Sequence, residues 1–600
     1  MPHHRHDPKD LLADQHNPPP SYDPPVRYQR MAEERDCRVG MRDGKQLCVD
    51  IYRPEAPGRF PALVSLAAHN KEFNTPEFAA AALNAQPAWS RVWMGGAEAG
   101  DSLYLASRGY AHVVGNNRGS GKSDGGGSPK WDSYDLVEWA AVQPWCDGNV
   151  GMIGLSAFAA AQFEAAALQP PHLKAIFPFG APHGYRFRDM FPGGVMHPFI
   201  YLLDALTVNH QVRGAPAPLS ADLEQKWQWA MNNPDYVMYP NIYNILTMKG
   251  QIYPLLFRAL IDPFDTEDSV GEAEASFANI KVPTYTGVSF SAYTYKRQMI
   301  GCLHAFEKIQ APKKLMLSGV AQIERPFHSF HGEMLRWFDH WMKGAKTGVM
   351  EEPAVKVWVA GENRWRQAGA WPLPETQWTP LYLHGWGRLR SQPFTPGARD
   401  GLPAPDAFLQ MPPTQTDEIQ RLRYMTEALA EDTPVIGPMS LTLHAAIDAE
   451  DTNWIVILKD VGPDNSVRSA RDGEMQVPAG LPEREITRGW LKASCRAIDP
   501  ERSRPGKPWH RLTREAWQPV IPGEVNEYVI ELMASANLFR RGHRICVEIT
   551  SLDLGSGPAG LTGVEYIPYH LCSSRTVTHR IYRDGRHPSH LLLPVVPVSN

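Results

Sequence analysis

Apolar runs and amphipathic stretches alternate along the first half of the chain. Residues 132–143 place apolar side chains at helical spacing, and an alanine-rich stretch follows residue 156. Continuous apolar runs with the length of buried strands occupy 60–68, 110–114, 150–155, 174–179, 282–288 and 313–318. Strands that alternate with helices in this way predict a doubly wound α/β sheet with parallel central strands.

The segments around this core have other patterns. Residues 39–54 alternate on either side of Asp43-Gly44, which predicts a β-hairpin. Residues 185–280 are rich in aromatic residues, Met and Pro and hold helical stretches such as 221–232, so we expect a helical cap over the sheet. Residues 335–342 predict a helix that ends before Gly344.

The chain becomes strand-rich after Gly348, and residues 390–417 predict a long surface loop. Short strands are expected at 355–359, 378–383, 441–446, 454–461, 528–532 and 545–549. This spacing favours a two-sheet sandwich or jelly roll. The predicted organisation is an N-terminal arm (1–37), an α/β domain (38–345) with the cap at 185–280, and a β-sandwich (346–600).

Residues 145–164 carry the strongest candidate chemistry. The string Gly154-Leu155-Ser156-Ala157-Phe158 follows an apolar strand and opens a helix. It partly matches G-x-S-x-G, the turn that presents a nucleophilic serine above the carboxyl end of a sheet. The alternative is a buried strand and helix with an incidental serine. His69 and Asn116 also fall at predicted strand ends, where function gathers in such sheets.

Composition and charge narrow the function classes. The net charge of −5 over 600 residues gives no reason to expect a nucleic-acid or anionic-membrane partner. Seven scattered cysteines argue against a disulfide framework and against zinc. No signal peptide or membrane span is expected, so the sequence predicts a cytoplasmic protein. No motif in the sequence implies a cofactor or a metal.

Longer strings link the whole chain to one family. They include MRDGKQLCVDIYRP, SRGYAHVVGNNRGSGKSDG, PWCDGNVGMIGLS, LRWFDHWMKG and VKVWVAGENRWR. From about residue 38 to 597 the chain resembles the cocaine esterase and X-prolyl dipeptidyl-peptidase family (peptidase S15, CocE/NonD). The resemblance implies an α/β-hydrolase domain with a helical cap and a C-terminal jelly-roll (galactose-binding-like) domain. It also implies a serine that attacks a small-molecule ester or amide.

The family's catalytic positions carry over to this chain only in part. The nucleophile corresponds to Ser156, and the following backbone amide, an oxyanion donor, corresponds to Ala157. His69 stands where the family has a tyrosine hydroxyl as second oxyanion donor. Ser291 falls at the position of the triad acid, and Ile323 at that of the triad histidine.

The substituted positions leave the base unassigned. Neither Ile323 nor the adjacent Gln322 can take a proton from a serine at neutral pH. His328 and His69 are therefore the candidate bases of a rebuilt triad in a working serine esterase or acyl hydrolase. The alternatives are non-hydrolytic chemistry, such as acyl transfer, elimination or cyclisation, and ligand binding alone. The sequence leaves the oligomeric state open, with a homo-oligomer as one alternative.

Two other groups of residues have structural and functional interpretations. Arg118 is expected to brace the strand ends through backbone carbonyls rather than to contact substrate. Asp262, Asp265 and Asp268 form an acidic group in the cap. They could receive a substrate amine, but a solvated loop is the favoured interpretation.

Overall fold

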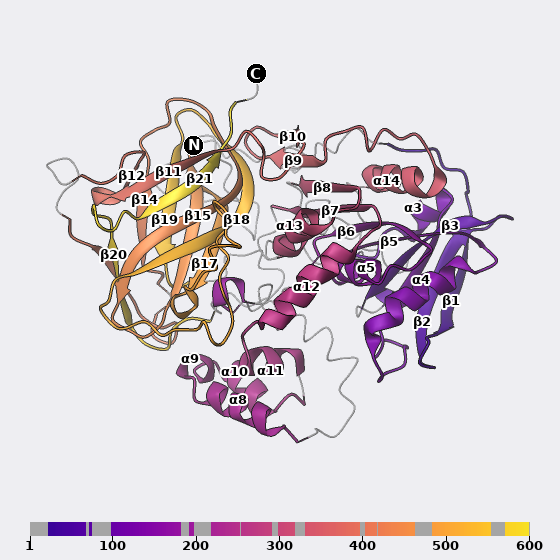
Figure 1. Cartoon of the computed structure of the whole chain (residues 1–600), viewed down its shortest axis with the longest axis horizontal. Helices are drawn as coiled ribbons and strands as arrows, with labels where there is room; N and C mark the ends of the chain where they lie inside the picture. Colours follow the sequence, from indigo (N-terminus) through magenta and orange to yellow (C-terminus); the bar gives the residue numbers. More distant parts are fainter. Residues whose placement is uncertain are drawn as a thin grey trace, which may run out of the picture.

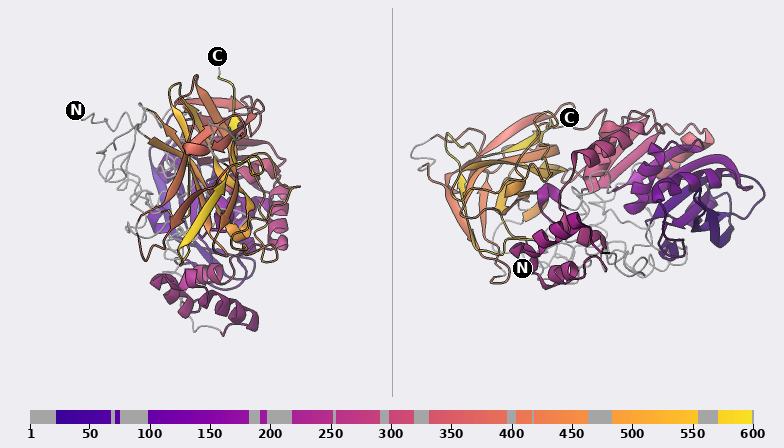
Figure 2. Two further views of the ribbon diagram at one scale, coloured as in Figure 1. Left: turned by 90° about the vertical axis from the view of Figure 1, so that its left-hand side faces the viewer. Right: turned by 60° about the horizontal axis from the view of Figure 1, so that its bottom comes forward.

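The computed structural model divides the protein into an α/β domain, a small helical cap and a β domain (Figure 1). The structure describes residues 22–67, 71–74, 98–181, 191–196, 218–251, 254–290, 298–318, 331–395, 403–416, 418–462, 483–553 and 571–598. The cap lies beside both larger parts (Figure 2). Within the ranges just given, no helix is long and apolar enough to cross a membrane.

The α/β domain is built on a ten-stranded sheet with the order β1-β2-β4-β3-β5-β6-β7-β8-β9-β10. The run from β4 to β9 is parallel, whereas β1–β2, β2–β4 and β9–β10 pair antiparallel. This confirms the predicted parallel core and hairpin. The strands are β1 Met31–Gly40, β2 Gln46–Pro54, β3 Phe60–Ala67, β4 Ala111–Asn116, β5 Cys146–Leu155, β6 Leu173–Phe179, β7 Thr284–Ser289, β8 Lys313–Ser318, β9 Val355–Val359 and β10 Arg364–Ala368.

Helices cover both faces of this sheet because its central strands are apolar on both sides. Met152 and Ile176 face one core, which also holds residues of α4, α5, α12 and α13. Ile153 and Phe177, the next residues along, face a second core under α3 and α14, which includes the fully buried Trp337. The helices are α3 Ser102–Ser107, α4 Asp132–Ala141, α5 Ala157–Ala167, α12 Glu267–Asn279, α13 Met299–Lys308 and α14 His331–Lys343.

The cap is a separate bundle of short helices with its own apolar core (Figure 1). Its described helices are α8 Ala221–Met231, α9 Pro234–Val237, α10 Pro240–Thr247 and α11 Pro254–Ile261. The predicted cap limit of 280 is too late, because α12 belongs to the helical layer of the sheet. The ring of Phe277 on α12 lies 5.4 Å from that of Phe163 on α5, edge to face.

The β domain confirms the predicted all-β architecture. Its described residues form eleven strands in the order β13-β20-β15-β18-β17-β16-β19-β14-β12-β11-β21, and an added β15–β21 pairing closes the sheet on itself around one core. The strands are β11 Gln377–His384, β12 Arg388–Arg390, β13 Asp406–Gln410, β14 Arg421–Met425, β15 Thr433–Ile447, β16 Asn453–Val461, β17 Glu483–Lys492, β18 Asn526–Phe539, β19 Arg544–Thr550, β20 Val577–Tyr582 and β21 His590–Val595.

Three predicted boundaries need correction. The loop expected at 390–417 contains β13, which pairs antiparallel with β20. The arm expected at 1–37 overlaps β1, which starts at Met31. The α/β domain does not end at 345, because the buried apolar strand β9 pairs with β8 and brings β10 into the same sheet. Strand-forming sequence looks alike in both domains, so local patterns could not assign β9 to its sheet.

Candidate active site

Ser156 occupies a strained bend between β5 and α5. Its backbone angles are φ 56° and ψ −116°, a combination that residues other than glycine rarely adopt. Neighbouring elements hold the bend in place: Leu155 N–H donates to Glu98 O at 2.8 Å, and Ser156 N–H donates to Phe179 O at 3.1 Å. The incidental-serine interpretation is therefore disfavoured, because such strain persists where the surroundings enforce it and gathers at functional sites.

The partial motif has a steric explanation. Gly154 has φ +138°, and a Cβ at this position would lie 2.2 Å from Phe158 Cβ. The first glycine of the motif is thus required by the approach of α5. Phe158 stands at the second glycine position and is fully buried against Tyr52, Ala67, Ala99 and Val114. The elbow accommodates this large residue because its side chain fills a separate apolar cluster.

The start of α5 lies where the family resemblance places an oxyanion donor. Ala159 and Ala160 donate their N–H groups back to Ser156 O at 3.0 Å each, which closes the first helical turn. Ala157 is the first residue of the helix, so α5 itself leaves its N–H without a partner. The helix dipole adds positive potential at the same place.

Gln298 is a site residue that the sequence did not reveal. Its side-chain Nε2 donates a hydrogen bond to Ser156 Oγ at 3.0 Å, and both residues are buried. Among the described residues, Gln298 is the side chain that hydrogen-bonds this hydroxyl. A primary amide donates well but cannot take a proton at neutral pH, so Gln298 can orient the nucleophile without being its base.

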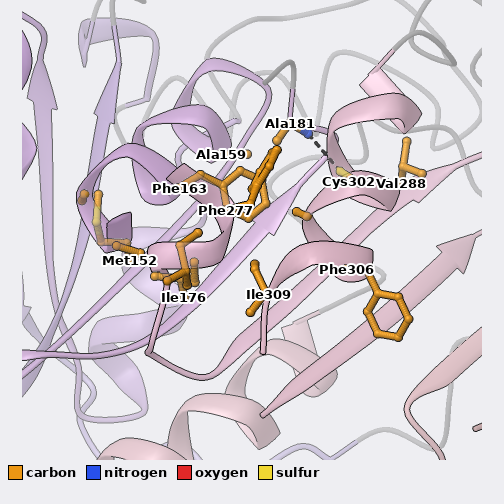
Figure 3. Close-up of a cluster of buried hydrophobic side chains, with 14 of the residues drawn as sticks. Met152, Ala159, Phe163, Ile176, Ala181, Phe277, Val288, Cys302, Phe306 and Ile309 are labelled. Atoms are coloured by element: carbon orange, nitrogen blue, oxygen red, sulfur yellow. Dashed lines mark hydrogen bonds between the residues drawn. The ribbon is translucent and has the colours of Figure 1, made fainter. Parts of the chain in front are cut away.

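The helix that starts directly after Gln298, α13, is fixed to the central sheet one turn further on. Cys302 Sγ donates to Gly287 O at 3.1 Å and accepts from Ala181 N–H at 3.2 Å, which ties α13 to the ends of β7 and β6. The second of these bonds is dashed in Figure 3, where α13 packs against the layer formed by α5 and Phe277. Burial raises the pKa of Cys302 to about 11, so its thiol remains a donor.

Most of the remaining predicted site residues lie outside the described residues. These are His69, Ser291, Gln322, Ile323 and His328. Which histidine serves as the base, and what replaces the triad acid, therefore stay predictions. His112 on β4 is buried, and its two ring nitrogens lie 3.0 Å from Ser65 Oγ and 2.8 Å from Ser102 Oγ.

Arg118 braces the turn after β4, but mainly through carboxylates. Its guanidinium donates to both carboxylate oxygens of Asp132 at 2.6 and 3.0 Å and to those of Asp43 at 2.7 and 3.1 Å. The predicted contact with a backbone carbonyl is also present, because Arg118 Nη1 donates to Gly126 O at 3.0 Å. These bonds raise the pKa of Arg118, and the nearly buried side chain is a structural element rather than a substrate contact.

The acidic residues of the cap serve its attachment to the β domain. Asp262 pairs with Lys226 at 2.7 Å and with Arg514 at 2.9 Å. Asp265 is buried, and its N–H donates to Leu512 O at 2.8 Å. The structure therefore corrects the solvated-loop interpretation for Asp262 and Asp265, whereas Asp268 is exposed in the first turn of α12. In the described ranges no set of three or more His, Cys, Asp or Glu residues could hold a metal ion.

Comparison with known proteins agrees with this architecture. A sequence model described as X-Pro dipeptidyl-peptidase (S15 family) matches residues 43–319, and one described as X-Pro dipeptidyl-peptidase C-terminal non-catalytic domain matches 347–592. The chain belongs to the peptidase S15 (CocE/NonD) family of hydrolases. It is 25% identical to a cocaine esterase of Rhodococcus sp. (strain MB1 Bresler), over 93% of this chain and 97% of the esterase.

Solved structures support the same fold. A CocE/NonD family hydrolase from Staphylococcus aureus aligns with a TM-score of 0.71 at 24% identity, over 95% of this chain and 94% of the other. An aminopeptidase from a marine sediment archaeon (Thaumarchaeota archaeon) aligns with a TM-score of 0.69 at 18% identity, over 97% of this chain and 99% of the other. Both confirm the α/β-hydrolase fold with its added β domain.

Proposed function

We propose that this family member is a serine hydrolase that cleaves an ester or amide through an acyl-enzyme on Ser156, with an altered triad. The strained backbone of Ser156 at the β5–α5 bend is the observation that supports it most directly. Similarity to a protein named cocaine esterase favours an ester substrate.

The geometry supports a two-step acyl transfer. Ser156 Oγ attacks the substrate carbonyl carbon while its proton passes to a base, and the carbonyl oxygen becomes an oxyanion that accepts from Ala157 N–H. Collapse of this intermediate expels the alcohol or amine, which takes up the proton and leaves an acyl group on Oγ. Water then attacks the acyl-enzyme, regenerates Ser156 and releases the acid. His328 and His69 remain the proposed bases.

Gln298 has a defined part in this scheme. Its Nε2–H lies against Ser156 Oγ, so the hydroxyl must direct its own hydrogen elsewhere, toward a base. The same donor stabilises negative charge that develops on Oγ as the proton leaves. Gln298 therefore positions the nucleophile and favours its ionised form.

The contact between Gln298 and Ser156 also favours a second candidate function. Because the described neighbour of Oγ cannot accept a proton, the site is also suited to a repurposed hydrolase. Such a protein would carry out acyl transfer, elimination or cyclisation, or would only bind a ligand.

Labelling with a serine-directed fluorophosphonate separates the two functions. A working hydrolase adds one phosphonyl group, detected by intact mass, and the Ser156→Ala variant adds none. Ser128→Ala, at an exposed serine away from the bend, is the matched control and should label like the wild type. The hydrolase function also requires turnover of at least one ester from an acyl ester panel. A protein that neither labels nor turns over any ester would favour the second function.

A further inference from the structure

The helix α13, which begins directly after Gln298, lies between the two large domains. On one side, Cys302 holds it to the ends of β6 and β7. Ile300, His304 and Glu307 follow one another at steps of four and three residues, so they share one side of the helix. This outer side lies roughly opposite Cys302, because successive residues of a helix are rotated by about 100°. Figure 1 shows α13 at the side of the α/β domain that faces the β domain.

Each of the three residues on the outer side of α13 contacts the β domain. His304 is buried, and its ring centroid lies 5.4 Å from that of Trp509, with 34° between the ring planes. Glu307 pairs with Lys507 at 3.1 Å. Ile300 packs against an apolar cluster that includes side chains of β16, β17 and β18, namely Val195, Ile455, Ile457, Trp490 and Met533. Trp509 is itself buried in the same core as α13, so the aromatic contact is the central one of the three.

Trp509 is carried by a hairpin-like loop of the β domain, residues 498–511. Asp499 N–H donates to Trp509 O at 2.8 Å, which joins the two sides of the loop. Trp509 N–H donates across the loop to Ser503 Oγ at 2.9 Å. Both backbone polar groups of Trp509 are thus bonded within the loop, which fixes the direction in which its ring leaves the backbone.

Directly after this loop, the chain is fixed to the cap. Leu512 O accepts from Asp265 N–H at 2.8 Å, and Arg514 pairs with Asp262 at 2.9 Å. The loop is therefore held both by its own bonds and by the cap, and it presents the ring of Trp509 to α13 from a fixed base.

The contacts of α13 bear directly on the nucleophile. Gln298 is the N-cap residue of α13, so its amide moves with the helix. The two hydrogen bonds of Cys302 would survive a roll of the helix about that line of attachment, but the roll would displace Gln298 sideways. Packing of His304 on Trp509, on the opposite side, blocks this motion. A displacement of about 1 Å would break the 3.0 Å bond from Gln298 to Ser156 Oγ, and misplacement by this amount can cost about a hundredfold in rate.

We propose that Trp509 is a positioning residue for the nucleophile. Its ring packs on His304 and holds α13 against the sheet, which keeps Gln298 in hydrogen-bond contact with Ser156. The kinetic consequences rest on the proposed function. Trp509 lies in the half of the chain that matches the non-catalytic domain, residues 347–592. That half therefore contributes to the reactivity of Ser156, and it does so through α13 rather than by acting on the substrate.

A double-mutant cycle with an accepted ester tests this role. Trp509→Leu should lower kcat about fivefold and change KM by less than about twofold, because the substrate still binds while the nucleophile loses part of its orientation. In the Gln298→Ala background, where the hydrogen bond is already absent, Trp509→Leu should lower kcat by less than about 1.5-fold further. Trp509→Phe keeps an aromatic ring against His304 and should retain more than about half of kcat.

The matched control is Trp517→Leu. Trp517 is a half-buried tryptophan of the same domain, and it packs against the β-domain core. This variant should leave kcat unchanged in both backgrounds. If Trp509→Leu lowered kcat by the same factor with and without Gln298, or did not lower it in the wild-type background, the positioning role would be wrong while the hydrolase function stood.

A second variant removes the same contact from the other side. His304→Ala deletes the ring on α13 and should reproduce the loss of kcat, and this loss should also disappear in the Gln298→Ala background. It decides the question if Trp509→Leu lowers the yield of folded protein. An undiminished loss in the Gln298→Ala background would contradict the proposal.

Crystal structures separate failure of the positioning role from failure of the hydrolase function. The distance between the side-chain amide of Gln298 and Ser156 Oγ is measured in the full-length wild type and in Trp509→Leu. We expect it to stay within hydrogen-bond range in the wild type and to exceed about 3.5 Å in the variant. An unchanged distance would refute the positioning role even if the wild type hydrolyses esters. A lengthened distance in a protein that turns over no ester would support the positioning role and count against the proposed function alone.

Discussion

Gln298 Nε2 donates to Ser156 Oγ at 3.0 Å, and the two residues, which directly precede α13 and α5, lie 142 positions apart in the chain. The contact joins the proposed nucleophile, on its strained backbone, to a group that can stabilise its ionised form but cannot deprotonate it. Chemistry at this centre must therefore divide two tasks, orientation and proton removal, between different side chains.

Two substitutions of Ser156 should have the same effect on activity and different effects on stability. Ser156→Ala should lower kcat/KM for an accepted ester by about 10³-fold or more, because the nucleophile is lost. Ser156→Gly should be equally inactive but should raise the free energy of unfolding by about 1 kcal/mol relative to Ser156→Ala, since glycine adopts φ 56° without strain. Steady-state kinetics and chemical denaturation measure both effects. Equal stability of the two variants would contradict the assignment of strain to this residue.

Replacement of Gln298 tests its donor role. Gln298→Ala should lower kcat about tenfold to a hundredfold with little change in KM, the loss expected for one hydrogen bond to a developing charge. Gln298→Glu should be active only at acidic pH, where a protonated carboxyl can still donate to Oγ. A pH–rate profile of the variant decides the matter. Activity that rises as Glu replaces Gln and ionises would instead identify this position as a place for a base.

A pair of glycine substitutions separates steric conflict from backbone strain. Gly154→Ala should destabilise the protein by about 3 kcal/mol or more, because the added Cβ would overlap Phe158 and because alanine would be strained at φ +138°. Gly148→Ala is the matched control: it also has positive φ, +93°, but no atom lies within 4 Å of its Cβ. It should cost about 1 kcal/mol. Equal thermal shifts for the two variants would show that the contact with Phe158 is not limiting.

Buried His112 predicts a loss of stability in acid. Burial lowers its pKa from 6.5 to about 3, so between these values the unfolded chain binds a proton that the folded protein does not. The free energy of unfolding should fall by about 1.4 kcal/mol per pH unit from this residue as the pH drops from about 6 toward 3. His579, whose pKa burial also lowers to about 3, should add a similar slope.

Denaturation at a series of pH values in the wild type and His112→Gln checks this prediction. The variant should lose stability less steeply by about 1.4 kcal/mol per pH unit, whatever its stability at neutral pH. The same slope in both proteins would mean that His112 is not the group responsible.

The elements that sequence patterns predicted well are those set by local rules. The apolar runs at β3, β5 and β8 and the bend at Ser156 could be identified because strand, turn and helix signals sit next to one another in the chain. The spacing of short strands after Gly348 likewise predicted the β domain, which the family resemblance specified further. The oxyanion donor at Ala157 stays a prediction from that resemblance.

The features that were missed depend on packing between distant segments. Gln298 reaches Ser156 because Cys302, one turn later, ties α13 to the ends of β6 and β7, and no motif around Gln298 encodes this contact. The assignment of α12 to the cap failed for the same reason, since the contact of Phe277 with Phe163 is invisible in either segment alone. The triad positions predicted at Ser291 and Ile323, and the candidate base His328, lie outside the described residues.

The shared position of β9 has a consequence for how the two halves of the chain could be separated. β9 and β10 lie in the half that sequence comparison assigns to the non-catalytic domain, yet they complete the edge of the catalytic sheet. Ala360, directly after β9, exchanges backbone hydrogen bonds with Ala536 and Leu538 of β18. A hydrolase fragment cut at residue 345 would expose the unpaired edge of β8 and tend to aggregate. The two domains are therefore joined through β9 and β10. Neither evolution nor an experimenter can exchange them as independent modules at the boundary between the two sequence models.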